Sequence, residues 1–178
     1  MIVVCGALRT RAGQPAMSQA IAAAAARSGA AVQVIGIVPE GANGDRLVLE
    51  LAEAGIGHAA VLRTQDRPME SADVSLALRY LPEVRVVVAA GLEPGLLTAV
   101  AEGAAFAGAP LVVVNVDHDA TDDPAMPVDA TVLAAPASDP DGTFAGFVAA
   151  FAVRLDRGEV PSDAWAGTLG ALAVDPVS

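Results

Sequence analysis

Short continuous runs of apolar residues alternate along the chain with segments whose apolar residues recur at helical spacing. Runs with the character of strands are Ile2–Cys5, Ala31–Val38, Ala59–Leu62, Val84–Ala90, Leu111–Val114 and Ala130–Ala135. Continuous apolar runs of this length are typical of parallel strands that are buried on both faces of a sheet. The pattern therefore predicts six strands, with Ala59–Leu62 as a short edge strand.

Helical spacing of apolar residues occupies the segments between these runs. We expect helices over Pro15–Arg27, from Gly44-Asp45 to Ala54, and over Asp73–Leu81, Leu96–Ala107 and Pro161–Val174. A strand, a helix and a strand in succession form a crossover that makes the two strands parallel. The alternation predicts an α/β fold with a doubly wound, mostly parallel sheet flanked by helices, as a single domain over residues 1–178.

One further helix is marked more clearly than the others. Its apolar residues recur at offsets of three, four, seven and eleven, and they are Phe144, Phe147, Val148, Phe151 and Leu155. Ser138, Asp139 and Asp141 precede this helix, where side-chain oxygens accept bonds from free amides, and Gly158 follows it. A glycine-containing loop before a helix is a usual phosphate site in doubly wound folds, but this loop carries two carboxylates.

Charge and composition exclude some classes of binding partner. The 178 residues include ten arginines, no lysine and 21 acids, for a net charge of −11. This charge repels the phosphate backbone, so we expect no nucleic-acid partner. No window reaches the roughly 18 consecutive apolar residues of a membrane span, so we expect a cytoplasmic protein without a membrane partner.

Cys5 is the only cysteine and lies in an apolar run, which indicates a buried structural thiol.

Two acidic features follow predicted strands. The densest polar cluster comprises Asp117, His118, Asp119, Asp122 and Asp123. It lacks the glycine turn and the distal Glu of a calcium loop, so we interpret it as a solvated loop and predict no metal site. Glu93 follows another buried strand, at the end of the sheet where ligands of open α/β folds bind.

Several stretches resemble the ribokinase-like (PfkB) family of carbohydrate and nucleoside kinases. They are residues 16–38 with Gly44-Asp45 and 51–56, Leu92-Glu-Pro94 with 107–113, and Asp141-Gly-Thr-Phe-Ala-Gly-Phe147 with the chain that follows to Val174. The last stretch resembles the family's Gly-Ala-Gly-Asp box and the helix after it. The resemblance implies a ribokinase-like core, and no counterpart of the family's lid strands is seen between Gly6 and Gly13.

The same resemblance implies that the kinase site has degenerated. Aligned on Phe144, the family's catalytic base falls on Gly142, and the glycines of its anion hole fall on Asp139 and Asp141. The family's substrate-binding Asn falls on Ser18. A register shifted by one residue would instead make Asp141 the base, with Pro140 removing one amide from the anion hole.

The sequence is compatible with three alternative functions. The first is a non-catalytic binding or assembly module that has lost the ATP site and the base. The second is a minimal sugar or nucleoside kinase that uses Mg-ATP, with Asp141 as base, Asp139 and Gly142 at the cofactor, and Ser18, Gln19 and Glu93 at the substrate. The third is a small-ligand binder at the carboxyl ends of the strands.

Assembly is a separate expectation. A core without a lid leaves sheet surface uncovered, so we expect a homodimer. Its surface is expected around Gly57–Pro68 or on the C-terminal helix that carries Trp165.

Overall fold

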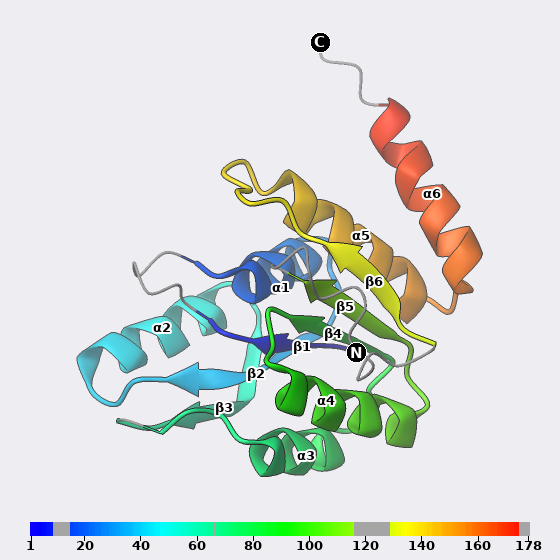
Figure 1. The fold of residues 1–178 in the computed structure, drawn as a ribbon. Helices are drawn as coiled ribbons and strands as arrows, with labels where there is room; N and C mark the ends of the chain where they lie inside the picture. Colours follow the sequence, from blue (N-terminus) through cyan, green and yellow to red (C-terminus); the bar gives the residue numbers. More distant parts are fainter. Residues whose placement is uncertain (9–14, 66, 116–128, 175–178) are drawn as a thin grey trace.

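The computed structural model describes residues 1–8, 15–65, 67–115 and 129–174 (Figure 1). Its elements are β1 (Ile2–Gly6), α1 (Met17–Arg27), β2 (Val32–Val38), α2 (Ala42–Glu53), β3 (Gly57–Arg63), α3 (Ser71–Tyr80), β4 (Val86–Ala90), α4 (Pro94–Ala107), β5 (Leu111–Asn115), β6 (Thr131–Ala134), α5 (Thr143–Asp156) and α6 (Pro161–Val174). The six strands form one sheet in the order β3-β2-β1-β4-β5-β6, and every pairing is parallel. The predicted α/β, doubly wound sheet is confirmed.

The helices cover both faces of this sheet. Alternate residues of β1 face opposite sides: Ile2 and Val4 join a core with α1, α2 and α5, whereas Val3 and Cys5 join a core with α3 and α4. Figure 1 shows the same division into layers. Because both faces are covered, the central strands read as unbroken apolar runs rather than as alternating ones.

All six predicted helices and all six predicted strands are present in the described ranges. Several of them begin at other residues than predicted. β4 begins at Val86 rather than at Val84, because β1 begins opposite it and pairs Ile2 with Val86. α4 begins at Pro94 rather than at Leu96, since proline fits the first helical position, where its missing N–H is not needed. The predicted loop at Asp117–Pro124 lies outside the described residues.

α2 also begins earlier than the sequence indicated. Gly41, with φ 84°, makes the turn before the helix, which starts at Ala42. Gly44 then lies in the first turn, where a Cβ would stand 1.7 Å from the carbonyl oxygen of Pro39. The glycine predicted as a helix opener is therefore needed for the close return of the chain after β2.

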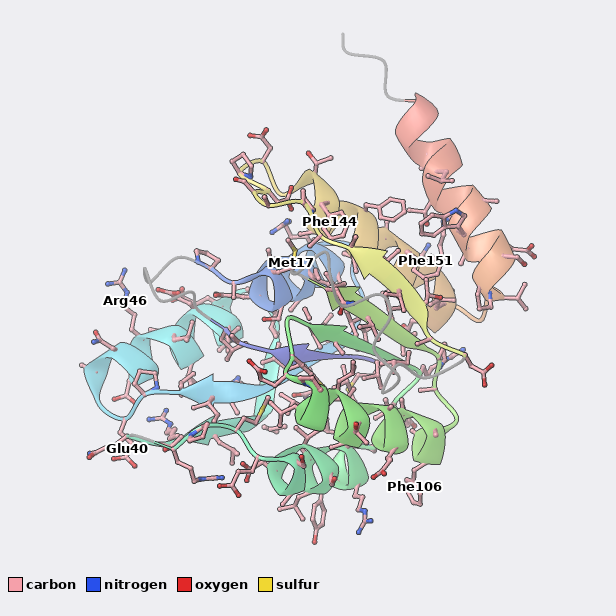
Figure 2. All side chains as sticks on the ribbon, in the orientation of Figure 1. Met17, Glu40, Arg46, Phe106, Phe144 and Phe151 are labelled. Atoms are coloured by element: carbon pink, nitrogen blue, oxygen red, sulfur yellow. The ribbon has the colours of Figure 1, made fainter. Side chains whose placement is uncertain are left out.

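The C-terminal helix α6 packs against α5 through aromatic rings. The ring of Trp165 meets those of Phe147 and Phe151 edge-on, with centroids 5.2 and 5.7 Å apart. Edge-to-face pairs of this kind contribute about 0.5–1.5 kcal/mol beyond the burial of their area. In Figure 2, Phe151 lies on α5 on the side toward α6, whereas Phe106 points outward from the end of α4. Within the described ranges, no helix is long and apolar enough to cross a bilayer.

Candidate functional site

The strand order places a ligand crevice between β1 and β4. From β1 the chain winds outward to β2 and β3, and after returning to β4 it winds the other way to β5 and β6. At such a switch point the connections leave in opposite directions, and a crevice opens at the carboxyl ends of the two central strands. Gly6 and Ala90 are the last residues of these strands.

At this point the backbone of β1 comes very close to β4 and to α1. A Cβ on Gly6 would lie 2.5 Å from the carbonyl oxygen of Ala90 and 2.9 Å from Cβ of Ser18. Gly6 also has φ 157°, which favours glycine. The end of β1 is therefore held directly against β4 and against the first turn of α1.

Ser18 and Gln19, both predicted to bind substrate, lie in that first turn. Ser18 is only 1% exposed, and its hydroxyl donates a hydrogen bond to the carbonyl oxygen of Ala7. This bond ties α1 to the segment that follows β1. Gln19 is half-buried, and its side-chain oxygen is buried without a hydrogen-bond partner in the described part of the chain.

The start of α5 is already occupied by a carboxylate. Asp139 accepts a hydrogen bond from the amide of Phe144 at 3.0 Å and another from the amide of Ala145 at 2.9 Å, one on each oxygen. Gly142 adopts the left-handed conformation, with φ 67°, just before the helix. Of the three side chains predicted to cap this helix, Asp139 does so. Ser138 and Asp141 make no side-chain hydrogen bond to any described residue.

Between the starts of α1 and α5 lies an open cavity of about 840 Å³, called here the helix-start cavity. Its lining includes Met17, Asp139, Asp141 and Gly142. A smaller cavity of about 270 Å³ adjoins it and reaches Ser18 and the ends of β4 and β6. The fold therefore brings together Ser18, Asp139, Asp141 and Gly142, four of the predicted site residues.

Glu93 lies elsewhere, beside a different hollow. This strand-end pocket has a volume of about 410 Å³ and opens at the carboxyl ends of β1, β2 and β4. Its apolar walls are formed mainly by Leu8, Ile37, Leu47, Met69, Leu92 and Leu96. The sequence analysis placed Glu93 and a ligand site at this end of the sheet, but it missed the apolar walls. The available signal was the pair Pro68-Met69, two apolar residues in an otherwise polar stretch.

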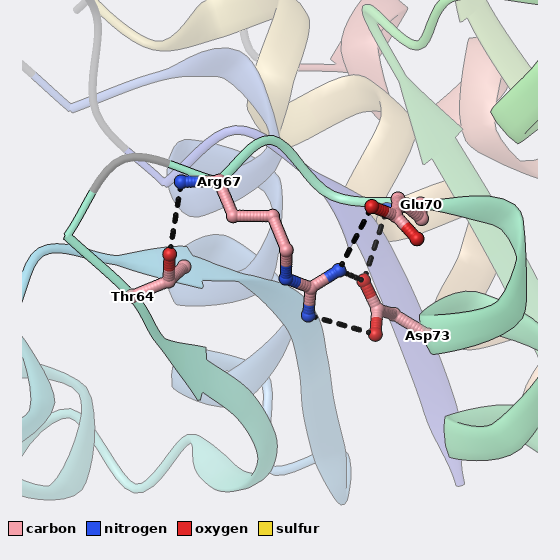
Figure 3. A network of polar contacts seen from close by, with 4 residues as sticks. All are labelled: Thr64, Arg67, Glu70 and Asp73. Carbon is pink, nitrogen blue, oxygen red and sulfur yellow. Dashed lines mark hydrogen bonds and ion pairs between the residues drawn. The ribbon is translucent and has the colours of Figure 1, made fainter.

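Arg67 lies at the edge of the strand-end pocket and is paired with two acidic side chains (Figure 3). Its guanidinium donates to both carboxylate oxygens of Asp73, at 2.7 and 3.0 Å, and lies 3.5 Å from Glu70. Its backbone N–H donates to the hydroxyl of Thr64 at 3.0 Å. The hydrogen bond from Arg67 lowers the pKa of Asp73, and the same bond raises the pKa of Arg67. Arg67 thus anchors the β3–α3 loop, and its guanidinium is already paired with two carboxylates.

The remaining candidate groups are Cys5 and the acidic side chains. Cys5 is fully buried, and this burial raises the pKa of its thiol to about 12, so the thiolate nucleophile is not formed at neutral pH. Among the described residues, no three His, Cys, Asp or Glu side chains gather closely enough to hold a metal ion. The cluster from Asp117 to Asp123 lies outside that part of the chain.

Comparisons with known proteins were informative only at the level of structure. No protein-family model matches the chain, and no curated protein matches it. Ribokinase from Arabidopsis thaliana, solved in complex with ribose and ATP, aligns with a TM-score of 0.65 at 14% identity, spanning 99% of this chain and 93% of that one. The microbiome-derived acarbose kinase Mak1 aligns with a TM-score of 0.63 at 15% identity, spanning 95% and 90%.

These similarities show that the chain has a ribokinase-like fold, as the sequence resemblance predicted. Identities of 14% and 15% establish the fold. Activity has to be argued from the site, because one fold hosts many functions.

Proposed function

We propose that this ribokinase-like chain is a non-catalytic protein that binds a small molecule in the crevice at the strand ends. Two of the site residues that the fold gathers have structural roles, and these roles support the proposal. Ser18 is buried and bonded to Ala7, and Asp139 caps α5.

The observation that carries this proposal is the pair of hydrogen bonds made by Asp139. A phosphate bound at a helix start uses the free N–H groups of the first turn and the positive end of the helix dipole. Here the amides of Phe144 and Ala145 are satisfied by a carboxylate that belongs to the protein. ATP would have to displace that carboxylate before it could use the same groups.

Electrostatics add to this competition. Two like charges 4 Å apart repel by about 1 kcal/mol in water and by about 4 kcal/mol near a protein surface. Asp139 and Asp141 both line the helix-start cavity, so a polyphosphate would meet both charges. The resemblance to the family places the base at Gly142, which has no side chain to accept a proton.

The Arabidopsis ribokinase was solved with ribose and ATP, so the contrast can be measured directly. We expect no heat of binding from Mg-ATP at millimolar concentration in isothermal titration of this chain. Asp139→Ala should then bind inorganic phosphate or ATP more strongly than the parent chain, since it releases two amides and removes one charge. Micromolar affinity of the parent chain for Mg-ATP would overturn the proposal.

A minimal kinase remains the second candidate, and one observation favours it. The carboxylate of Asp141 lines the helix-start cavity and has no hydrogen-bond or ion-pair partner among the described residues. A base must be free in this way to accept the proton of a substrate hydroxyl. Mg-ATP would be its cofactor, and a sugar or nucleoside its substrate.

Phosphotransfer assays with a panel of sugars and nucleosides test this candidate. Any turnover should fall by at least about a hundredfold in Asp141→Asn if Asp141 is a general base. The control is Asp129→Asn, which makes the same change in an exposed residue before β6, at the opposite end of the sheet. Turnover that survives in Asp141→Asn would rule out this role.

Location and assembly belong to the same proposal. We place the protein in the cytoplasm because a single cysteine allows none of the internal disulfides that are common in small secreted domains. We also propose that it forms a homodimer, through the sheet edge considered in the Discussion.

A further inference from the structure

We infer that the strand-end pocket binds a small molecule with an apolar body and a cationic end. This inference deepens the proposed binding function and rests on it. The pocket has about 410 Å³ of space, within the range of roughly 300–1,000 Å³ that is usual for small-molecule sites.

The walls determine the body of the ligand. They consist mainly of side chains from Leu8, Ile37, Leu47, Met69, Leu92 and Leu96, contributed by β2, α2, α4 and three connecting segments. Hydroxyl groups pressed against such walls lose their bonds to water and gain none in return. A sugar is therefore a poor occupant, whereas each methylene of an apolar body gains from burial.

The charges at the edge of the pocket determine the polar end of the ligand. Glu93 lines the pocket, is exposed, and has no hydrogen-bond or ion-pair partner for its carboxylate among the described residues. Arg67, the only cation among the described residues that line the pocket, donates a hydrogen bond to Asp73 at 2.7 Å and lies 3.5 Å from Glu70. Among the described residues, the one unpaired charge beside the pocket is thus negative, on a chain with a net charge of −11. An ammonium group is attracted to this edge, and a carboxylate or phosphate is repelled.

A matched set of probes separates the contribution of the apolar walls from that of the charge on Glu93. The probes are butylammonium, hexylammonium, 1-hexanol and hexanoate, titrated into the full chain and followed by the backbone amide signals in nuclear magnetic resonance. We expect shifts at Met69, Gly91 and Leu92. Hexylammonium should bind about fifteenfold more tightly than butylammonium, since each buried methylene contributes about fourfold. It should also bind about tenfold more tightly than hexanoate at low salt.

Variants then assign the effect to this pocket. Met69→Trp and Leu96→Trp fill the space and should abolish the shifts, whereas Leu76→Trp, at a side chain 58% exposed on α3, should not. Glu93→Gln should remove most of the preference for hexylammonium over 1-hexanol while 1-hexanol still binds. Its matched control is Glu102→Gln, on the helix α4 that Glu93 precedes but outside the pocket lining, which should keep that preference.

Ribose and Mg-ATP belong in the same titration because they distinguish two kinds of failure. The inference is overturned if hexanoate binds as well as hexylammonium, if ribose shifts these amides and the alkyl probes do not, or if no compound shifts them. Shifts caused by Mg-ATP at Phe144 and Ala145 would instead overturn the proposed loss of the nucleotide site, and they would leave the inference about the pocket standing.

Discussion

Asp139 shows how much one side chain can decide at the candidate site. Its two carboxylate oxygens accept hydrogen bonds from the amides of Phe144 and Ala145, which are otherwise unpaired at the start of α5. We predict that Asp139→Ala lowers the free energy of unfolding by about 1–2 kcal/mol, the usual cost of losing a helix cap. Urea denaturation followed by circular dichroism measures this loss.

Asp141 supplies the matched control for that prediction. It lies two residues further along the same loop and makes no side-chain hydrogen bond to the described residues. Asp141→Ala should therefore change the free energy of unfolding by no more than about 0.5 kcal/mol. Equal losses in the two variants would show that the capping bonds of Asp139 do not stabilise the helix.

Cys5 gives a second prediction for a single residue, concerning pH. Burial raises the pKa of its thiol from 9.0 to about 12 in the folded chain. Below pH 9 both states hold the neutral thiol, and the stability is unaffected. Between pH 9 and 12 only the unfolded chain ionises, so stability falls by about 1.4 kcal/mol for each pH unit.

The non-ionisable variant Cys5→Ala isolates this effect. It loses some packing at every pH but has no thiol to titrate. We predict that the stability advantage of the parent chain over Cys5→Ala shrinks by about 2 kcal/mol between pH 8 and 10.5 in urea denaturation. A constant difference across that range would mean that the thiol ionises in the folded chain as readily as in the unfolded one.

At the scale of elements, the sequence located every strand and helix in the described ranges because each carries a strong local signal. Unbroken apolar runs mark the strands, and glycine or proline marks most helix ends. The starts of β4 and α2 were less predictable, since they depend on a neighbour. β4 begins where β1 offers a partner, and α2 begins where Gly41 turns the chain.

The contact between β1, β4 and α1 carries a prediction of its own. Gly6→Ala places a Cβ against the carbonyl oxygen of Ala90 and Cβ of Ser18, neither of which can move without shifting an element. We expect a loss of about 1–3 kcal/mol from this overpacking. The control is Gly146→Ala within α5, where a Cβ meets nothing within 4 Å. It should stabilise the chain by about 1 kcal/mol, since alanine favours the helix. Thermal denaturation of both variants tests the contrast, and similar changes would contradict it.

At the scale of the whole molecule, the sequence predicted part of the candidate site. Asp139, Asp141 and Gly142 are adjacent in one motif, so their grouping was visible without a structure. The apolar walls of the strand-end pocket were not visible, because they come from segments between Gly6 and Leu96 that only the sheet order brings together. No local pattern records that Met69 and Leu8 line one cavity.

The sheet itself has two edges, and they differ in how well they are protected. β6 is an edge of four residues with Pro136 two positions beyond its end. β3 is an edge of seven residues, Gly57–Arg63, without proline or lysine, and its only formal charge is Arg63 at the end, paired with Asp45. Short strands and proline block edge pairing, so β3 is the open edge. Trp165, on the other predicted surface, packs on Phe147 and Phe151 and remains 36% exposed.

A second copy of the chain can pair with this edge. β3 carries no Asp or Glu on a chain of net charge −11, so it is a stretch where two copies can approach with little repulsion. Antiparallel pairing about a two-fold axis through Ala60 sets Ala59 opposite Val61 of the second copy. We predict a homodimer, with twice the 17.7 kDa mass of one chain in light scattering at micromolar concentration.

Charge at the centre of that edge should separate the copies. Ala59→Lys places two lysines near the two-fold axis, where they repel each other and obstruct pairing, so the mass should fall to that of one chain. Ala105→Lys adds the same charge at an exposed position of α4 and should leave the dimer intact. Added salt should strengthen the parent dimer, since it screens the repulsion between two acidic chains. A mass near 17.7 kDa for the parent chain at every concentration and salt would contradict assembly through β3.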